Sequence, residues 1–190
     1  MAKRALPPAT KLFPVPTVLV SCVDAEGNAN IITIAWVGVV CSEPPILSVS
    51  IRPRGRHSYG IVMATNEFVV NIPPAGKVRE TDYCGTVSGK NVDKFEAAGL
   101  TALPASSVKA PLIAECPVNL ECVVRHRLAL GTHDVFLAEV VALHADEEAL
   151  DSKGRLDIAK IAPIAFCDGG YYAMGDLIGT YGFSKGKLEG

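Results

Sequence analysis

Short runs of Val, Ile, Leu and Ala, each ended by Pro, Gly or Asn, dominate this sequence of 190 residues. Such runs are typical of β-strands joined by turns, because β-branched side chains favour strands while Gly, Pro and Asn favour turns. In the N-terminal half we expect strands near Thr17–Asp24, Asn30–Val40, Ile46–Ile51 and Phe68–Ile72. Short helices are predicted around His57–Thr65, Lys77–Cys84 and Asp93–Ala98, and Gly99 is a suitable end for the last of them.

The C-terminal half predicts a long hairpin, with strands at Val118–Leu130 and Val135–Leu143 joined by a Gly-Thr-His-Asp turn. Polar residues alternate with the apolar ones in the first strand: Asn119, Glu121, Arg125 and Arg127. This alternation predicts one buried face and one solvated face. Strands and helices do not alternate regularly, as a doubly wound fold would require. We therefore expect a closed or nearly closed antiparallel barrel with a few helices covering its ends.

The charge distribution excludes several classes of partner. The chain has 18 Lys and Arg against 20 Asp and Glu, a net charge of −2, which argues against a general nucleic-acid binder. A membrane helix needs about 20 apolar residues. The longest charge-free run, Gly27–Ser42, is shorter and contains Asn and Thr, so no membrane span is expected. The N-terminal MAKRALPPATK lacks the apolar stretch of a signal peptide, which predicts a cytoplasmic protein.

Metal and disulfide chemistry is not indicated by the six cysteines and four histidines. The cysteines form no C-x-x-C pair, and the histidines are scattered rather than set at ligand spacing. We expect the cysteines to be structural thiols and predict no metal site.

Two segments concentrate positive charge near predicted helix starts. The first follows a strand and contains Arg52, Arg54, Arg56 and Ser58. The second contains Ser88, Lys90 and Lys94. Guanidinium groups beside free helix N–H groups suit a phosphate, and two such segments in a chain of low charge favour that interpretation. A solvated basic loop is the alternative for the first segment taken alone.

The only tryptophan, Trp36, ends a strand that carries amide and hydroxyl groups at Asn28, Asn30 and Thr33. Polar groups beside a flat apolar side chain suit a planar heterocycle with hydrogen-bonding edges. A tryptophan that fills the core is the alternative.

Five segments follow one another in an order that resembles the flavin reductase-like family of FMN-binding split barrels, in particular the flavoredoxins. They are NANIITIAW, PPILSVSIRPRGRHSY, NEFVVNIP, YCGTVSGKNVDKF and GTHDVFLAEVV. The resemblance runs from about Phe13 to Phe166. It implies a single FMN-binding domain over residues 1–190, an antiparallel split β-barrel of Greek-key type with short covering helices. Its core would span about 13–166, followed by a C-terminal extension at 167–190.

The resemblance also implies roles for individual residues. Those expected to contact the isoalloxazine ring of FMN are Asn30, Ile32, Thr33 and Trp36. The phosphate is expected near Ser50, Arg52 and Ser58, and Lys94 is expected to reach the phosphate or the ribityl chain. His133 and Phe166 are expected to lie beside the flavin. None of these residues is predicted to be catalytic, because the flavin carries the chemistry.

Two functions remain open from the sequence. The first is an oxidoreductase that moves electrons from NADH or NADPH through FMN to flavin, ferric iron or a protein acceptor. The second is a non-enzymatic FMN electron carrier served by a redox protein partner. The sequence has no G-x-G-x-x-G fingerprint, so a nicotinamide would bind transiently over the flavin. A barrel that binds another phosphorylated cofactor or haem is a third reading. The resemblance further implies a homodimer with flavin sites near the subunit interface.

Overall fold

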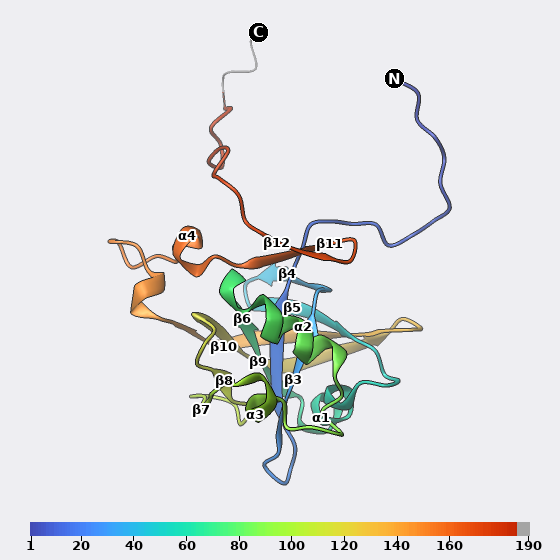
Figure 1. Ribbon diagram of the computed structural model, residues 1–190, viewed down its shortest axis with the longest axis vertical. Coiled ribbons are helices and arrows are strands. Elements are labelled where there is room, and N and C mark those ends of the chain that lie inside the picture. Colours follow the sequence, from blue (N-terminus) through green and yellow to red (C-terminus); the bar gives the residue numbers. More distant parts are fainter. Residues whose placement is uncertain (186–190) are drawn as a thin grey trace.

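A seven-stranded antiparallel sheet forms the body of the molecule in the computed structural model, which describes residues 1–185 (Figure 1). Its order is β3-β2-β6-β9-β10-β5-β4. The strands are β2 (Val18–Val23), β3 (Ala29–Ile34), β4 (Val37–Ser42), β5 (Pro45–Ile51), β6 (Glu67–Ile72), β9 (Val118–Ala129) and β10 (Asp134–Ala145). Within the described residues β3 and β4 are the two edges and do not pair with each other. The predicted mainly β, antiparallel split barrel is confirmed.

Short helices and two small sheets cover the barrel. The helices are α1 (His57–Thr65), η1 (Ala75–Lys77), α2 (Val78–Thr86), α3 (Lys94–Ala98), η2 (Glu147–Ala149) and α4 (Ile158–Ile161). One small sheet joins β1 (Val15–Pro16), β11 (Ile164–Cys167) and β12 (Gly170–Ala173), and the other pairs β7 (Ala102–Leu103) with β8 (Leu112–Ile113). The β1-β11-β12 sheet lies across one end of the barrel, and the described residues before β1 and after β12, up to 185, extend away from it (Figure 1). The last five residues of the predicted extension 167–190 lie outside the described residues.

Local sequence signals account for the helix bounds. Asp93 precedes α3, and its carboxylate accepts hydrogen bonds from the backbone N–H groups of Phe95 and Glu96 at 2.8 and 3.2 Å. Gly99 ends the same helix in the left-handed conformation, with φ of 60°. Gly99 is the C-cap that the sequence predicts, whereas Asp93, expected as the first residue of the helix, is its N-cap.

The barrel interior is filled by side chains of opposite sheet strands and of α1. Phe68 and Phe136 are the largest fully buried side chains, and Val20, Val49 and Val62 pack in the same cluster. This apolar cluster holds α1 against the barrel, so that the start of α1 has a fixed place.

The predicted strand Asn30–Val40 is wrong as a single element. The chain bends at Ala35 and Trp36, and β3 and β4 on either side of the bend form opposite edges of the sheet. The Trp36 carbonyl accepts a hydrogen bond from Ser50 N at 2.9 Å. The charge-free run contains no Pro or Asn at the bend, so no local turn signal marks it.

The predicted faces of β9 are also wrong in part. Asn119 and Glu121, expected in solvent, are 6% and 0% exposed, whereas Leu128 and Leu130 are 48% and 67% exposed. Residues 106–108 lie over the outer face of β9 and donate backbone hydrogen bonds to Glu121. The C-terminal end of β9 extends beyond the core, so the apolar side chains there are exposed to solvent.

Four of the six cysteines are buried, while Cys41 and Cys167 are partly exposed, and all six are free thiols. No helix within residues 1–185 has both the length and the apolar character needed to span a membrane.

Glu121 should contribute strongly to folding. Burial alone would raise the pKa of its carboxyl, but hydrogen bonds from Ser106, Ser107 and His144 outweigh burial and hold the pKa at about 2. We expect Glu121→Gln to lower the free energy of unfolding by about 2–3 kcal/mol at pH 7, measured by urea titration. A carboxyl whose pKa is lowered on folding stabilises the protein fully above its unfolded pKa. The mutational effect should therefore shrink as pH falls from about 4.5 towards 2.

The matched control is Glu139→Gln, because Glu139 sits in a partly exposed ion pair with Arg125 at 2.8 Å. It should change the free energy of unfolding by less than about 1 kcal/mol. Equal effects of the two substitutions would show that the Glu121 hydrogen bonds do not stabilise the 106–108 loop.

Candidate functional site

Three cavities that share lining residues lie around β3, the start of α1 and the β9–β10 turn. The central cavity, of about 350 Å³, is lined by Ile32, Thr33, Ile34, Ala35, Trp36, Ser50, Arg52, Arg56, His133 and Phe166. The α1 cavity, of about 90 Å³, is lined by Asn30, Ile32, Gly55, Arg56, His57, Ser58, Thr86, Val87, Ser88, Gly89 and Lys94. The hairpin cavity, of about 320 Å³, is lined by Arg52, Pro53, Arg54, Gly131 and Thr132.

The central cavity combines a strand edge with flat side chains. One wall is the end of β3 and the bend that follows it, and β3 is an edge strand. Backbone N–H and C=O groups on such an edge are available to a ligand. Trp36 is 44% exposed, and its ring lies 4.5 Å from that of His133, tilted by 36°. A planar group with hydrogen-bonding edges fits between these walls.

His133 is held in one protonation state by its neighbours. Arg52 Nε donates to His133 Nε2 at 3.3 Å, and since a guanidinium has no acceptor, Nε2 carries no proton. The proton then lies on Nδ1, which is 3.0 Å from Thr132 Oγ1. Burial lowers the pKa of His133, and the positive charges of Arg52 and Arg56 lower it further. His133 therefore presents a neutral ring to the central cavity at neutral pH.

The α1 cavity has the features of an anion site. Arg56 precedes α1 and gives no side-chain hydrogen bond to its first turn, which leaves backbone N–H groups for a ligand. Ser58 is buried, and its hydroxyl accepts a hydrogen bond from Asn30 Nδ2 at 2.8 Å. Ser58 is therefore held at the wall of the cavity by Asn30. A volume of about 90 Å³ holds about three water molecules, the scale of one phosphate group.

Lys94 lines the α1 cavity and also holds its walls together. The side chain is 3% exposed, and Nζ donates to the carbonyls of Ile31 and Cys84, both at 2.7 Å. Burial lowers the pKa of the ammonium group, and Cys84 opposes that shift. Two of its three N–H groups therefore bind β3 and α2, and one remains for a ligand.

The backbone at position 89 passes so close to the side chain of Asn30 that only glycine fits there. A Cβ at this position would lie 2.0 Å from Asn30 Oδ1, so no other residue fits without moving Asn30 away from Ser58. Sequence reasoning passed over Gly89, although a glycine beside Ser88 in a predicted anion segment was a usable signal.

All the predicted site residues line the central or the α1 cavity. Those that line the central cavity are Ile32, Thr33, Trp36, Ser50, Arg52, His133 and Phe166. Asn30, Ser58 and Lys94 line the α1 cavity, and Ile32 lines both cavities. The expected phosphate residues are divided, because Ser50 and Arg52 lie at the central cavity and Ser58 at the α1 cavity. Their contacts with a flavin remain predictions.

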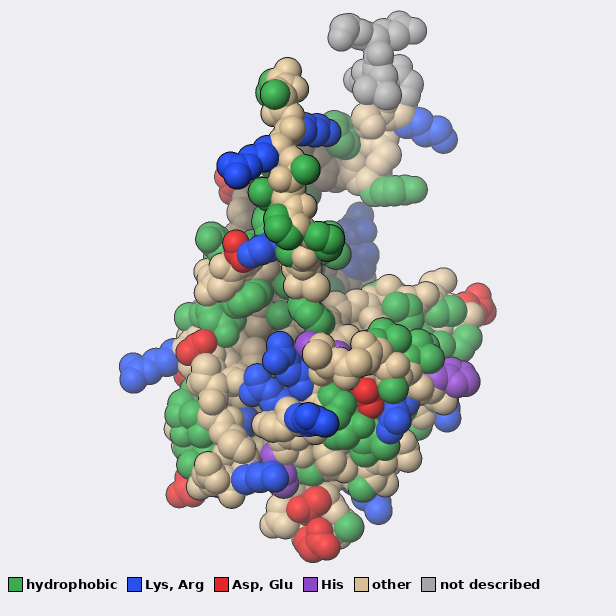
Figure 2. Space-filling model, turned by 90° about the vertical axis from the view of Figure 1, so that its right-hand side faces the viewer, with side chains coloured by type: hydrophobic (Ala, Val, Ile, Leu, Met, Phe, Trp, Pro, Cys, Tyr) green, Lys and Arg blue, Asp and Glu red, His purple; other side chains and the backbone are tan. Residues whose placement is uncertain are grey.

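The two positively charged segments meet at one place. Residues 55–58 and 86–89, together with Lys94, line the same α1 cavity, whereas Lys90 does not line it. Arg56, which belongs to the first of the two segments predicted to bind phosphate, lines both the central and the α1 cavities and donates to Gly85 O at 3.1 Å. Figure 2 shows Lys and Arg side chains gathered on one face of the body, beside His side chains.

A family model described as "Flavin reductase like domain" matches residues 10–175. The chain belongs to the flavin reductase-like family. The solved structure of flavoredoxin of Desulfovibrio vulgaris (Miyazaki F) is 35% identical, with a TM-score of 0.90 over 98% of this chain and 100% of that one. Flavoredoxin from Methanosarcina acetivorans is 32% identical, with a TM-score of 0.85 over 97% and 98% of the two chains.

Relatives of this flavin reductase-like chain include an uncharacterized protein of Archaeoglobus fulgidus. It is 32% identical over 147 residues, which cover 77% of this chain and 80% of the relative. The resemblance inferred from the sequence is thereby confirmed, with flavoredoxins among its most similar solved structures. The family supports a flavin cofactor, and the joined central and α1 cavities have walls that fit one.

Proposed function

We propose that this protein binds FMN and transfers electrons from NADH or NADPH through it to a flavin, ferric iron or protein acceptor. The observation that carries the proposal is the junction of two cavities. Ile32 and Arg56 belong to both the central and the α1 cavities, which supports a ligand with a planar ring in the first and one phosphate in the second. A flavin mononucleotide has this pairing of groups.

The chain contributes binding and orientation. When bound, FMN supplies the hydride and single-electron chemistry. The β3 edge offers backbone groups to the ring, while Trp36 and His133 provide flat neutral surfaces beside it. Arg56, Ser58 and the first turn of α1 hold the phosphate, and Lys94 keeps β3 and α2 at the distance this requires.

A nicotinamide donor would use the open side of the central cavity. The sequence has no dinucleotide fingerprint, and Trp36 on the cavity wall is 44% exposed. A second planar ring can reach the flavin there without a domain of its own. The same openness would admit a redox protein partner, which is the basis of the electron-carrier alternative.

We also propose that the protein is a homodimer. An apolar hollow of about 440 Å³ along β4, β5, β9 and β10 is lined by Val39, Cys41, Pro45, Ile46, Leu47, Leu120, Val140, Val141, Ala142 and Leu143. Val39 and Leu143 are 76% and 56% exposed. Apolar side chains are also exposed along both extended chain ends, including Leu12 and Ile178. Exposed apolar surface of this extent favours a protein interface, and a second copy would cover it.

Loss of a phosphate contact should weaken FMN binding but not riboflavin binding. We expect Arg56→Ala to raise the Kd for FMN about tenfold or more, the effect of a lost charge-assisted hydrogen bond. The Kd for riboflavin, which has no phosphate, should stay nearly constant. Fluorescence titration measures both, and Arg79→Ala is the control because exposed Arg79 lines none of these cavities. Equal weakening of both flavins would show that Arg56 does not bind the phosphate.

Anaerobic addition of NADH or NADPH to the FMN-loaded protein should bleach the visible absorption band of the flavin. Unchanged colour with both donors would overturn the nicotinamide step and leave the electron-carrier alternative. A protein that takes up no added FMN would overturn the whole proposal.

Light scattering at micromolar concentration should give twice the chain mass of 20.0 kDa. The double variant Val39→Asp/Leu143→Asp should shift the mass to one chain, because charge within the apolar hollow opposes its burial. Val78→Asp, at an exposed position of α2 outside the hollow, is the control and should leave the mass unchanged. A single-chain mass for the unaltered protein would overturn the dimer.

A further inference from the structure

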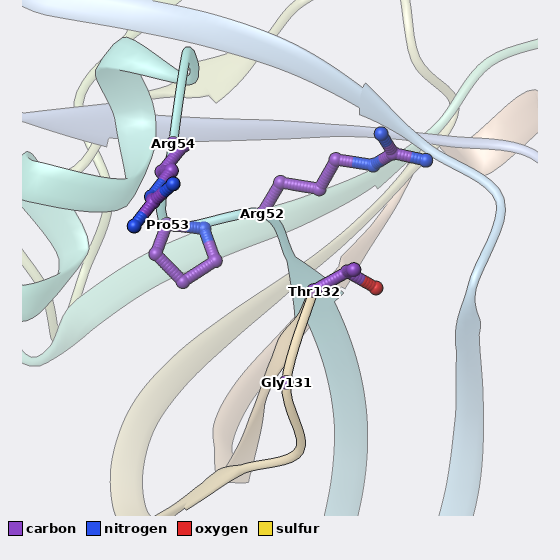
Figure 3. A pocket seen from close by; sticks show the side chains of 5 residues that line it. All are labelled: Arg52, Pro53, Arg54, Gly131 and Thr132. Atoms are coloured by element: carbon purple, nitrogen blue, oxygen red, sulfur yellow. The ribbon is translucent and has the colours of Figure 1, made fainter.

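The turn between β9 and β10 carries His133 into the wall of the central cavity, although the turn itself is exposed. Residues 125–132 all face solvent. The hairpin cavity lies between Gly131 and Thr132 on one side and the loop after β5 on the other (Figure 3). Exposed turns of this kind are mobile unless hydrogen bonds tie them down. The position of His133 therefore depends on the residues that anchor the turn.

Asp134, the residue after His133, is the buried anchor of the turn. It is 4% exposed, and its backbone pairs with Ala129 on β9 and Ile51 on β5. Its carboxylate accepts a hydrogen bond from the Tyr59 hydroxyl of α1 at 2.7 Å. A buried carboxylate is strongly unfavourable without such a donor. The hydrogen bond from Tyr59 therefore fixes where Asp134 lies.

Arg127 contacts the same carboxylate but holds it less firmly. Its Nε lies 3.4 Å from Asp134 Oδ2, and its side chain is 40% exposed, so solvent screens the ion pair. Arg127 belongs to β9, in the same hairpin, and its hydrogen bond to α1 is to the weak acceptor Met63 Sδ at 3.1 Å. The Tyr59 hydroxyl is therefore the stronger link between the hairpin and α1.

The Tyr59 side chain is held at its ring as well as at its hydroxyl. The ring packs edge-on against Phe136, with centroids 5.9 Å apart and planes at 62°, beside the apolar cluster that holds α1 to the barrel. The hydrogen bond to the Asp134 carboxylate raises the pKa of Tyr59, so the hydroxyl remains a donor at neutral pH. A rigid ring that ends in one directed donor transmits the position of α1 to the turn.

The other contacts of His133 are too weak to replace this anchor. Arg52 Nε donates to it at 3.3 Å from an exposed position, and Thr132 belongs to the same exposed turn. The contact between the rings of His133 and Trp36, 4.5 Å apart, lasts only while the turn stays in place. Side chains that touch a ligand are commonly oriented by outer partners of this kind.

We propose that Tyr59 is a positioning residue: through Asp134 it holds His133 against Trp36, beside the proposed place of the flavin ring. The inference rests on the proposed function and deepens it. The first turn of α1 is proposed to hold the phosphate, and Tyr59 lies on the same helix. One helix would thus position the ring and the phosphate of the ligand relative to each other.

The first measurement follows the imidazole of His133 by long-range proton–nitrogen NMR, before and after FMN loading. The unaltered protein should show one fixed tautomer, with the proton on Nδ1, and His133→Gln identifies the signal. Tyr59→Phe keeps the ring on Phe136 but removes the hydroxyl. It should average the two ring nitrogens, because a loosened turn breaks the contact with Arg52.

The second measurement is the anaerobic rate at which NADH or NADPH reduces the bound flavin. Tyr59→Phe should lower this rate about tenfold, while the Kd for FMN changes less than about twofold, because only the orientation of a wall residue is lost. Asp134→Ala should slow the reduction similarly. Asp134→Asn keeps an oxygen that accepts from Tyr59 and should restore most of the lost rate.

Thr65→Val is the matched control, because it also removes a hydroxyl of α1 that makes a hydrogen bond, to Ile61 O at 2.9 Å, away from the cavities. It should leave the His133 signal and the reduction rate unchanged. If Tyr59 acted on stability alone, the two variants would have equal effects on both measurements.

An unchanged His133 tautomer in Tyr59→Phe would overturn the inference, as would an averaged signal with an unchanged reduction rate. If neither nicotinamide reduces the unaltered protein, the proposed function is wrong in that step. The His133 signal then decides the inference alone, since it depends on neither donor.

Discussion

The buried ammonium group of Lys94 fixes the relation between the barrel and its helices. Its two hydrogen bonds, to Ile31 O on β3 and Cys84 O on α2, join an edge strand to a helix from a distant part of the chain. A buried cation without such partners would be strongly unfavourable, so these carbonyls and Lys94 require one another. The α1 cavity exists because α2, the 86–89 segment and β3 are held at this spacing, and the central cavity continues from it along β3.

Local patterns predicted the elements of this fold better than the way they combine. The caps of α3, the span of α1 and the long β9–β10 hairpin follow from residue types and spacing. The division of residues 30–40 into β3 and β4 did not, because the bend at Trp36 is imposed by pairing with different strands on its two sides. The burial of Glu121 could not be predicted either. The residues that cover it, Ser107 and Val108, lie outside β9, and the alternation within β9 does not reveal them.

The candidate site shows the same limit. Positive charge at 52–58 and 88–94 was visible in the sequence, but its convergence on one cavity depends on α1 and α2 lying side by side with β3. The family resemblance selected residues that all lie around the two joined cavities, because it carries tertiary information that composition lacks. The neighbouring Ser88 could have drawn attention to Gly89, but the constraint that requires a glycine comes from Asn30, which is far away in sequence.

The position of β3 at the edge of the sheet has a consequence for solubility. An unpaired strand edge is a template for pairing with another chain and hence for aggregation. Here Lys94 occupies the Ile31 carbonyl, and the remainder of the edge forms the wall of the central cavity. A ligand bound along that wall would shield the strand from intermolecular pairing, so occupancy of the cavity and colloidal stability of the protein would be coupled through the same backbone groups.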